Sequence, residues 1–261
     1  MYILGFETTG PICSVALMDL ENREKIHMIN GNEPMSHLKD LTKNARRLMD
    51  ENEIKVDEIK AAAASIGPGS FTGIRIGVTT ARSVAQTLGI TCVAVPTLES
   101  FKTKEVNGII VPIFNARRGQ VYGAIFSGEE DTMAPGPYML TDVLDRLKEH
   151  LDSSFINEEE KVDITFFGDG IDAYTKELEA YKDELEGEGP INISFADKEQ
   201  RYQTADMIVK LAASKYDAGD LLVLEELLPD YMRKAEAEQK LEDGTLEKLR
   251  KAKLARLLGE A

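Results

Sequence analysis

Apolar and polar positions alternate along the chain in a way that predicts short strands and amphipathic helices in succession. Apolar runs at residues 2–6 and 12–18 flank the polar segment ETTGP, as in a β-hairpin, and residues 25–29 are a candidate third strand. Ser36 is a suitable N-cap for a helix over about 37–52, because apolar residues recur there at helical spacing.

The next apolar run, IKAAAASIG, is typical of a buried strand and leads into a second amphipathic helix. In that helix, predicted from Ile74, apolar residues continue every three or four positions to Leu88, and Ser70 and Thr72 supply capping oxygens before it. The segment ITCVAVP then predicts a strand, and TLESFK predicts the start of a short helix.

The same order of elements then begins again. Apolar strands at about 109–114 and 120–126 surround NARRG as a second hairpin, and VDITFFGDG is a strand that ends in a glycine turn. Further helices are predicted at about 140–151, with Thr141 as the cap, at 171–183 and at 203–215.

This repeated pattern predicts two related α/β lobes with a boundary near residues 103–108. We therefore expect an N-terminal lobe over 1–105 and a C-terminal lobe over 106–235. Residues 236–261 form a charged tail that we expect to be helical.

Composition narrows the class of protein. The chain has 261 residues, 43% of them hydrophobic, which is enough for one large or two ordinary cores. We see neither a signal peptide nor an apolar run near the ~20 residues of a membrane span, and only two cysteines, Cys13 and Cys92, so we expect a reduced cytoplasmic protein. The net charge of −15 disfavours direct binding of nucleic acid, which depends on neutralising phosphates.

The glycine-rich stretch SIGPGSFTGIRIG, residues 65–77, suggests a phosphate loop at first sight. However, Ile74 and Arg75 follow the last glycine of its turn where a P-loop needs Lys and Ser or Thr. Pro68 also removes a backbone N–H that a dinucleotide loop would use. The simplest interpretation is a close-packing helix entry, in which glycines allow a near approach to neighbouring backbone.

Several segments together resemble the TsaB family, also called YeaZ. They are SIGPGSFTGIRIGVTTARSVA, LGFETTGPICSVAL, MSHLKDLTKNARRLMDE, NARRGQVYGAIF, FFGDG and PDYMRKAEAE, in that family's order and over nearly the whole chain. The resemblance implies an α/β fold of the actin/Hsp70/sugar-kinase type, with two duplicated ribonuclease H-like lobes.

The resemblance also implies a function. TsaB proteins are considered non-catalytic partners that bind and activate a TsaD enzyme when N6-threonylcarbamoyladenosine is made at position 37 of tRNAs reading codons that begin with A. The expected partners are thus a TsaD-type enzyme and a TsaE-type ATPase, with a homodimer when the chain is alone. Contact with tRNA is expected only indirectly, and contact with membranes is not expected.

No catalytic, metal or cofactor site is predicted, although a nucleotide at a joint interface with the partner stays open. The three histidines, His27, His37 and His150, include no pair one helical turn apart of the kind found in TsaD. ATP-binding relatives of this fold carry an Asp-x-Gly-Thr turn, whereas this chain has Glu7 and a later Gly10. A peptidase or hydrolase using Ser65 or Ser70, and an ATP-dependent kinase, are the alternatives.

The partner interface is expected on the two helices of the first lobe. Small residues permit close helix contact, and methionines suit adaptable packing. The candidate residues are Met35, His37, Leu38, Met49, Gly69, Ser70, Phe71, Thr72, Gly73, Arg75, Ile76, Gly77, Thr80, Ala81, Arg82, Val84 and Ala85.

Overall fold

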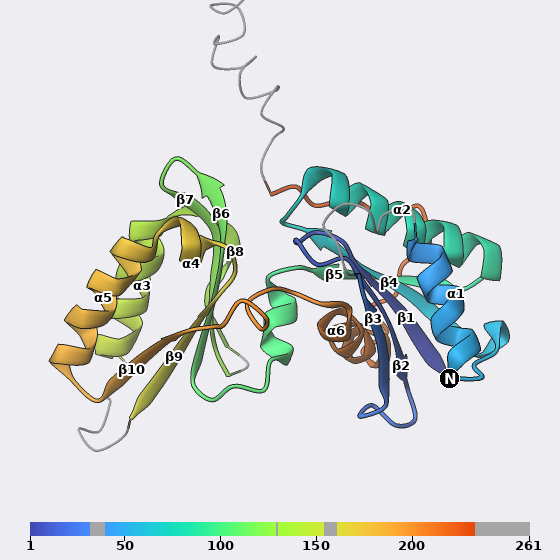
Figure 1. Ribbon diagram of the computed structural model, residues 1–261, viewed down its shortest axis with the longest axis horizontal. Coiled ribbons are helices and arrows are strands. Elements are labelled where there is room, and N and C mark those ends of the chain that lie inside the picture. Colours follow the sequence, from blue (N-terminus) through green and yellow to red (C-terminus); the bar gives the residue numbers. More distant parts are fainter. Residues whose placement is uncertain (32–39, 129, 154–160, 233–261) are drawn as a thin grey trace, which may run out of the picture. The chain divides into compact units, whose positions relative to one another are not determined.

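The first half of the chain forms a five-stranded sheet with helices on both faces. In the computed structural model, which describes residues 1–31, 40–128, 130–153 and 161–232, the strand order is β3-β2-β1-β4-β5. Strands β1, β2 and β3 are antiparallel, and β4 and β5 run parallel to β1 (Figure 1). The bounds of the strands are β1 Tyr2–Glu7, β2 Ser14–Asp19, β3 Ile26–Asn30, β4 Ile59–Gly67 and β5 Thr91–Pro96.

The second half repeats this topology. Its sheet has the order β10-β9-β6-β7-β8, in which β6, β7 and β8 are antiparallel and β9 and β10 run parallel to β6. The bounds are β6 Ile109–Arg117, β7 Gln120–Ser127, β8 Glu130–Met139, β9 Val162–Phe167 and β10 Ile191–Phe195. Both sheets therefore place the first strand of a hairpin at the centre, which confirms the predicted duplicated fold.

Side-chain alternation divides the first sheet into two apolar faces. Ile3 and Ala63 belong to the cluster that packs on α6, while their neighbours Leu4 and Ala64 point to the opposite face. Figure 1 shows α1 and α2 on that second face. The helices are α1 Leu41–Glu51, α2 Phe71–Leu88 and α6 Ala205–Asp217, and short 3₁₀ turns lie at Val56–Glu58 (η2) and Glu99–Thr103 (η3).

Helix α6 lies far along the chain from the sheet that it covers. Its buried residues Ile208 and Val209 pack against the first sheet, and a Cβ added at Gly5 would lie only 2.5 Å from Val209 Cγ1. Helix α6, which belongs to the predicted C-terminal lobe 106–235, thus packs on the sheet of the predicted N-terminal lobe 1–105. Residues 1–230 form one compact unit.

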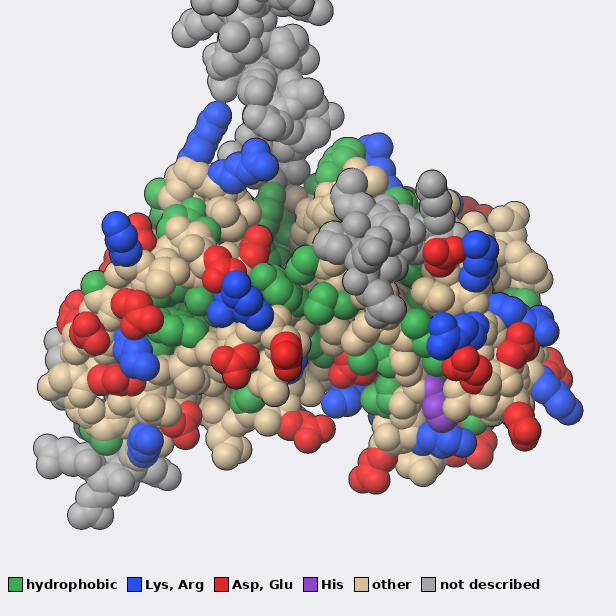
Figure 2. Space-filling model, in the orientation of Figure 1, with side chains coloured by type: hydrophobic (Ala, Val, Ile, Leu, Met, Phe, Trp, Pro, Cys, Tyr) green, Lys and Arg blue, Asp and Glu red, His purple; other side chains and the backbone are tan. Residues whose placement is uncertain are grey.

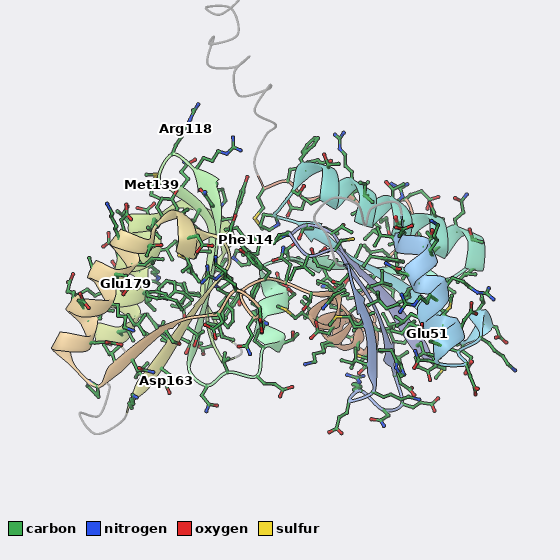
Figure 3. All side chains as sticks on the ribbon, viewed as in Figure 1. Glu51, Phe114, Arg118, Met139, Asp163 and Glu179 are labelled. Carbon is green, nitrogen blue, oxygen red and sulfur yellow. The ribbon has the colours of Figure 1, made fainter. Side chains whose placement is uncertain are left out.

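The second sheet is covered on one face by α3 Leu140–Ser153 and α5 Thr175–Glu188, with the short α4 Gly170–Ala173 before α5. Its other face carries an aromatic cluster in which Phe101 contacts Phe114 and Phe167, with ring centroids 5.8 and 5.5 Å apart. Figure 3 shows Phe114 inside the molecule and Arg118 pointing outward from the tip of the β6–β7 hairpin.

Several element boundaries differ from the sequence predictions. Asp40 stands at the N-cap of α1, and the predicted cap Ser36 lies outside the described residues. Helix α2 begins at Phe71 rather than Ile74, and Thr141 lies within α3 instead of capping it. The helix predicted over 171–183 is interrupted at Tyr174. Strands β8 and β10 were not predicted, and the predicted helix over 236–261 lies outside the described residues.

Candidate functional site

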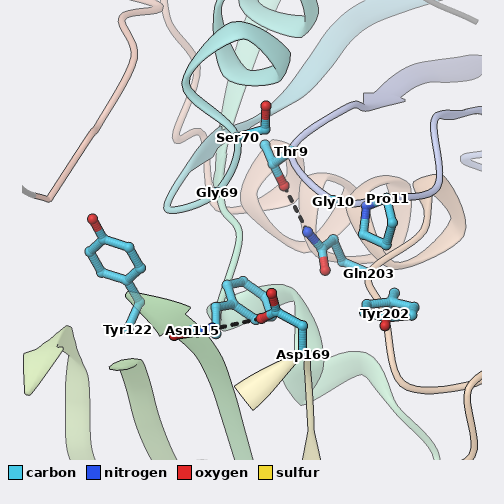
Figure 4. A pocket seen from close by; sticks show the side chains of 11 residues that line it. Thr9, Gly10, Pro11, Gly69, Ser70, Asn115, Tyr122, Asp169, Tyr202 and Gln203 are labelled. Atoms are coloured by element: carbon cyan, nitrogen blue, oxygen red, sulfur yellow. Dashed lines mark hydrogen bonds between the residues drawn. The ribbon is translucent and has the colours of Figure 1, made fainter. Parts of the chain in front are cut away.

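A cavity of about 520 Å³ lies where the first hairpin turn, the start of α2 and the segment before α6 face the ends of β6 and β9 (Figure 4). Ligand sites in proteins are commonly of this size. Its lining residues are Thr9, Gly10, Pro11, Gly69, Ser70, Phe114, Asn115, Tyr122, Asp169, Tyr202 and Gln203.

The first hairpin turn forms one wall and is closed by a buried carboxylate. Glu7 has no exposed surface, and its Oε1 accepts hydrogen bonds from Thr9 N at 2.5 Å, Thr9 Oγ1 at 2.6 Å and Gly10 N at 3.3 Å. Burial raises the pKa of Glu7, and this effect outweighs the opposing hydrogen bonds from Thr9 and Gly10. The side chain therefore holds the turn and does not reach the cavity.

A hydrogen-bond chain extends from Glu7 into the cavity wall. Gln203 Nε2 donates to Thr9 Oγ1 at 2.9 Å, and a Cβ at Gly10 would come within 2.7 Å of that nitrogen. Gln203 is only 2% exposed, and its Oε1 is buried without a hydrogen-bond partner among the described residues. Sequence reasoning missed Gln203, because a single glutamine carries no recognisable pattern.

The opposite wall comes from the second lobe. Asp169, exposed in the turn after β9, accepts a hydrogen bond from Asn115 N at 2.9 Å, and Asn115 Oδ1 accepts one from Arg117 N at 2.8 Å. Partial burial raises the pKa of Asp169. Asn115 thus stabilises its turn through the backbone of Arg117.

The glycine-rich stretch packs tightly against the first hairpin turn. A Cβ at Gly73 would lie 1.9 Å from the carbonyl oxygen of Thr8, and one at Gly77 would lie 2.4 Å from Thr8 Oγ1. Thr8 Oγ1 in turn donates to the Gly73 carbonyl at 2.7 Å. Ser70 Oγ accepts from Gly73 N at 3.2 Å and caps α2 as predicted. These glycines are needed for a backbone approach within the chain.

The predicted interface residues fall into three groups. Five of them are buried in the chain's own core, which corrects the expectation that they offer surface to a partner: Met49, Gly73, Gly77, Ala81 and Ala85. The exposed or half-buried ones are Gly69, Ser70, Phe71, Thr72, Arg75, Ile76, Thr80, Arg82 and Val84. Met35, His37 and Leu38 lie outside the described residues.

The exposed start of α2 carries an aromatic–cation pair, and a row of half-buried side chains continues along the helix. Phe71 is 42% exposed, and the Arg75 guanidinium lies 4.0 Å from its ring centroid. Ile76, Thr80 and Val84 follow at four-residue spacing as a half-buried row along the helix. We call these three residues the α2 row.

The two serines named for the hydrolase alternative both lie in the glycine-rich stretch. Ser65 is fully buried, and the Ser70 hydroxyl is used as the helix cap. Within the described part of the chain, no three side chains of His, Cys, Asp or Glu gather as metal ligands. Burial and the Glu7 carboxylate raise the pKa of Cys13 to about 11, so its thiol stays protonated at neutral pH.

Comparison with known proteins gives the family. Residues 34–243 match the family model described as TsaD: tRNA N6-adenosine threonylcarbamoyltransferase. The tRNA threonylcarbamoyladenosine biosynthesis protein TsaB of Bacillus subtilis is 28% identical over 248 residues, which is 92% of this chain and 97% of that protein. The chain belongs to the TsaB (YeaZ) family, within the wider family of that model.

Other TsaB relatives match over shorter stretches. The TsaB protein of Escherichia coli is 29% identical over 135 residues, which is 50% of this chain and 57% of that protein. Among solved structures, YeaZ from Pseudomonas aeruginosa superposes with a TM-score of 0.64 at 19% identity, over 88% of this chain and 99% of that one. This likeness supports the TsaB fold for the chain.

Acidic and basic side chains are interspersed on the face seen in Figure 2. None of the helices in the described ranges is both long and apolar enough to cross a bilayer.

Proposed function

We propose that the chain is a non-catalytic TsaB subunit that binds and activates a TsaD-type enzyme during formation of N6-threonylcarbamoyladenosine at position 37 of tRNAs reading codons that begin with A. The observation that carries the proposal is the match to TsaB of Bacillus subtilis over 92% of this chain. The match extends through both lobes, so it is not a shared fragment of a common fold.

The first hairpin turn supports a role without catalysis. In this fold an acidic side chain at the turn would have to reach a ligand, but Glu7 is fully buried beneath Thr9 and Gly10. No cofactor is proposed for the subunit, and a TsaE-type ATPase would supply nucleotide hydrolysis to the complex. Direct recognition of tRNA would come mainly from partners in the cytoplasm, because the chain carries a net charge of −15.

The α2 row is the proposed contact with TsaD. Ile76 and Val84 leave apolar surface on the helix, and Thr80 between them is small enough for a second helix to approach closely. We propose that the same surface forms a weak homodimer when TsaD is absent. The neighbouring Phe71–Arg75 pair would extend this contact at the start of the helix.

Reconstitution tests the function. Threonylcarbamoyladenosine formation by TsaC, TsaD and TsaE proteins is measured with and without this chain, and we expect product only when the chain is present. Unchanged product formation in its absence would overturn the proposal.

A matched pair of variants tests the interface. Thr80→Glu places a charge within the α2 row and should weaken co-elution with TsaD about tenfold or more, because the charge loses water on binding. Gln86→Glu adds the same charge at an exposed position outside the row and should leave the complex intact. Equal binding by both variants would remove the α2 row as the contact.

A further inference from the structure

The amide orientation of Gln203 is fixed by its neighbours and leaves an acceptor in the cavity wall. Thr9 Oγ1 has one proton and donates it to Glu7 Oε1 at 2.6 Å, so toward Gln203 it can only accept. The Gln203 group that faces Thr9 is therefore the amino group. Figure 4 shows the oxygen turned away from Thr9, and this buried Oε1 has no partner among the described residues.

The remaining polar chemistry of the cavity is also that of an acceptor. Asp169 contributes its carboxylate from the opposite wall and is the one charged residue among those that line the cavity in the described ranges. A buried acceptor without a partner is unfavourable, and a bound donor would remove that cost. The site thus favours a ligand that donates hydrogen bonds and carries positive charge.

Aromatic rings supply the apolar part of the same cavity. Phe114, Tyr122 and Tyr202 all line it, and a volume of about 520 Å³ admits a small organic molecule rather than a bare ion. Aromatic faces attract cations and stack on flat groups. The aromatic rings and the hydrogen-bond acceptors together favour a ligand with a flat or apolar body and a positively charged donor group.

A nucleoside triphosphate, the ligand that the fold suggests, does not fit this set of groups. Its phosphates need cations or free N–H donors, yet the lining within the described ranges holds no Lys, Arg or His, and Asp169 would repel them. Glu7, at the position of the acidic residue in ATP-binding turns, is fully buried.

We propose that this cavity binds a small organic cation, a flat or apolar body that bears an ammonium, amidinium or guanidinium group. Its N–H donors bond Gln203 Oε1 and Asp169, and its body lies against Phe114, Tyr122 and Tyr202. The proposal is independent of the subunit role above, since it concerns the free chain.

Titration of the full chain with benzamidine, a flat amidinium, tests the site. Amide signals of Gly10, Gly69 and Gln203 should shift saturably in nuclear magnetic resonance spectra, with a Kd of about 1 mM or tighter, as expected for so small a ligand. Benzoate has the same ring and the opposite charge and should leave these signals unchanged. Absence of shifts with benzamidine, or equal shifts with benzoate, would overturn the proposal.

Two charge-matched variants locate the binding. Asp169→Asn removes the cavity carboxylate and should weaken benzamidine binding about tenfold, the usual effect of losing one charge-assisted hydrogen bond. Asp145→Asn removes an exposed carboxylate from α3 and should leave the Kd unchanged. Both positions are exposed, so both variants should fold, and equal Kd values for the two would refute the assigned site.

Discussion

The two hairpin turns occupy equivalent places in the duplicated topology but are stabilised in different ways. The start of the β1–β2 turn is buried, with Thr8 and Thr9 each only 3% exposed, and it is held by Glu7 and the glycines of α2. The β6–β7 turn is exposed at Arg117 and Arg118, which both have positive φ, 65° and 56°. The same strand topology therefore holds a turn whose first residues pack against α2 in the first lobe and a turn exposed to solvent in the second.

Glycines that follow β4 and β9 in the chain, Gly73 in the first turn of α2 and Gly168 directly after β9, show what the lobes share. A Cβ at Gly73 would strike the Thr8 carbonyl, and one at Gly168 would lie 2.2 Å from the carbonyl oxygen of Ile113. Each lobe thus brings a glycine against a backbone carbonyl oxygen, that of Ile113 within central strand β6 or that of Thr8 directly after central strand β1. The helix that follows is continuous over 18 residues in the first lobe but broken at Tyr174 in the second.

The largest expected loss of stability comes from adding a side chain at Gly73, where α2 contacts the first hairpin turn. Gly73→Ala places a methyl group 1.9 Å from Thr8 O, so the turn and α2 must separate, and we expect a loss of about 3 kcal/mol in the free energy of unfolding. Chemical denaturation measures it. Gly89→Ala is the control. It adds a methyl group at the C-cap of α2, where φ is 65° and no other atom lies within 4 Å of the new Cβ. We expect it to lower the free energy of unfolding by about 1 kcal/mol, because only the backbone conformation is unfavourable. Equal losses would mean that close packing does not distinguish Gly73.

A smaller effect should follow from the buried carboxylate of the first turn. The folded-state pKa of Glu7 lies above its ordinary value of 4.5, so folding takes up a proton, and stability should fall as pH rises from that value through the folded pKa. Glu7→Gln keeps an oxygen acceptor for Thr9 and Gly10 without the charge. We expect its stability to decline less than that of the parent between pH 5 and pH 8, by urea denaturation. Parallel declines would contradict a raised pKa.

The smallest effect is expected at the second turn. Arg118→Gly relieves a left-handed backbone conformation and should raise stability by about 0.5 kcal/mol. Arg118→Ala keeps that conformation unfavourable and should be neutral within error. Thermal unfolding of both variants measures the difference, and a destabilised Arg118→Gly would show that the arginine side chain, not the backbone, supports this turn.

Periodicity predicted the central strands and the covering helices of each lobe, but not the edges of the second sheet. Strand β8 contains Pro135, Gly136 and Pro137, which usually indicate a loop. At a sheet edge the missing N–H groups of proline cost little, so the segment pairs with β7 along one side. Strand β10, the other edge, alternates apolar and polar residues as INISF, but it has only five residues, so its signal is short.

The candidate cavity was predicted only in fragments. The turn at Glu7 and the glycines before α2 stood out as a pattern, and Asp169 appeared within FFGDG. Gln203 joins them through a contact between residues 194 positions apart, which no local pattern encodes. The burial of Ala81 and Ala85 was equally invisible, because small apolar residues suit both a core and a partner contact.

The placement of α6 has a consequence for how the protein is made. Residues 1–96 supply every strand of the first sheet, but the helix that covers one of its faces begins only at Ala205. At about 5–20 residues per second, a ribosome needs roughly 5–20 s to add the intervening segment. During that interval the face around Ile3 and Val93 lacks its native cover, so chaperone occupancy on the nascent chain should end once α6 has left the exit tunnel.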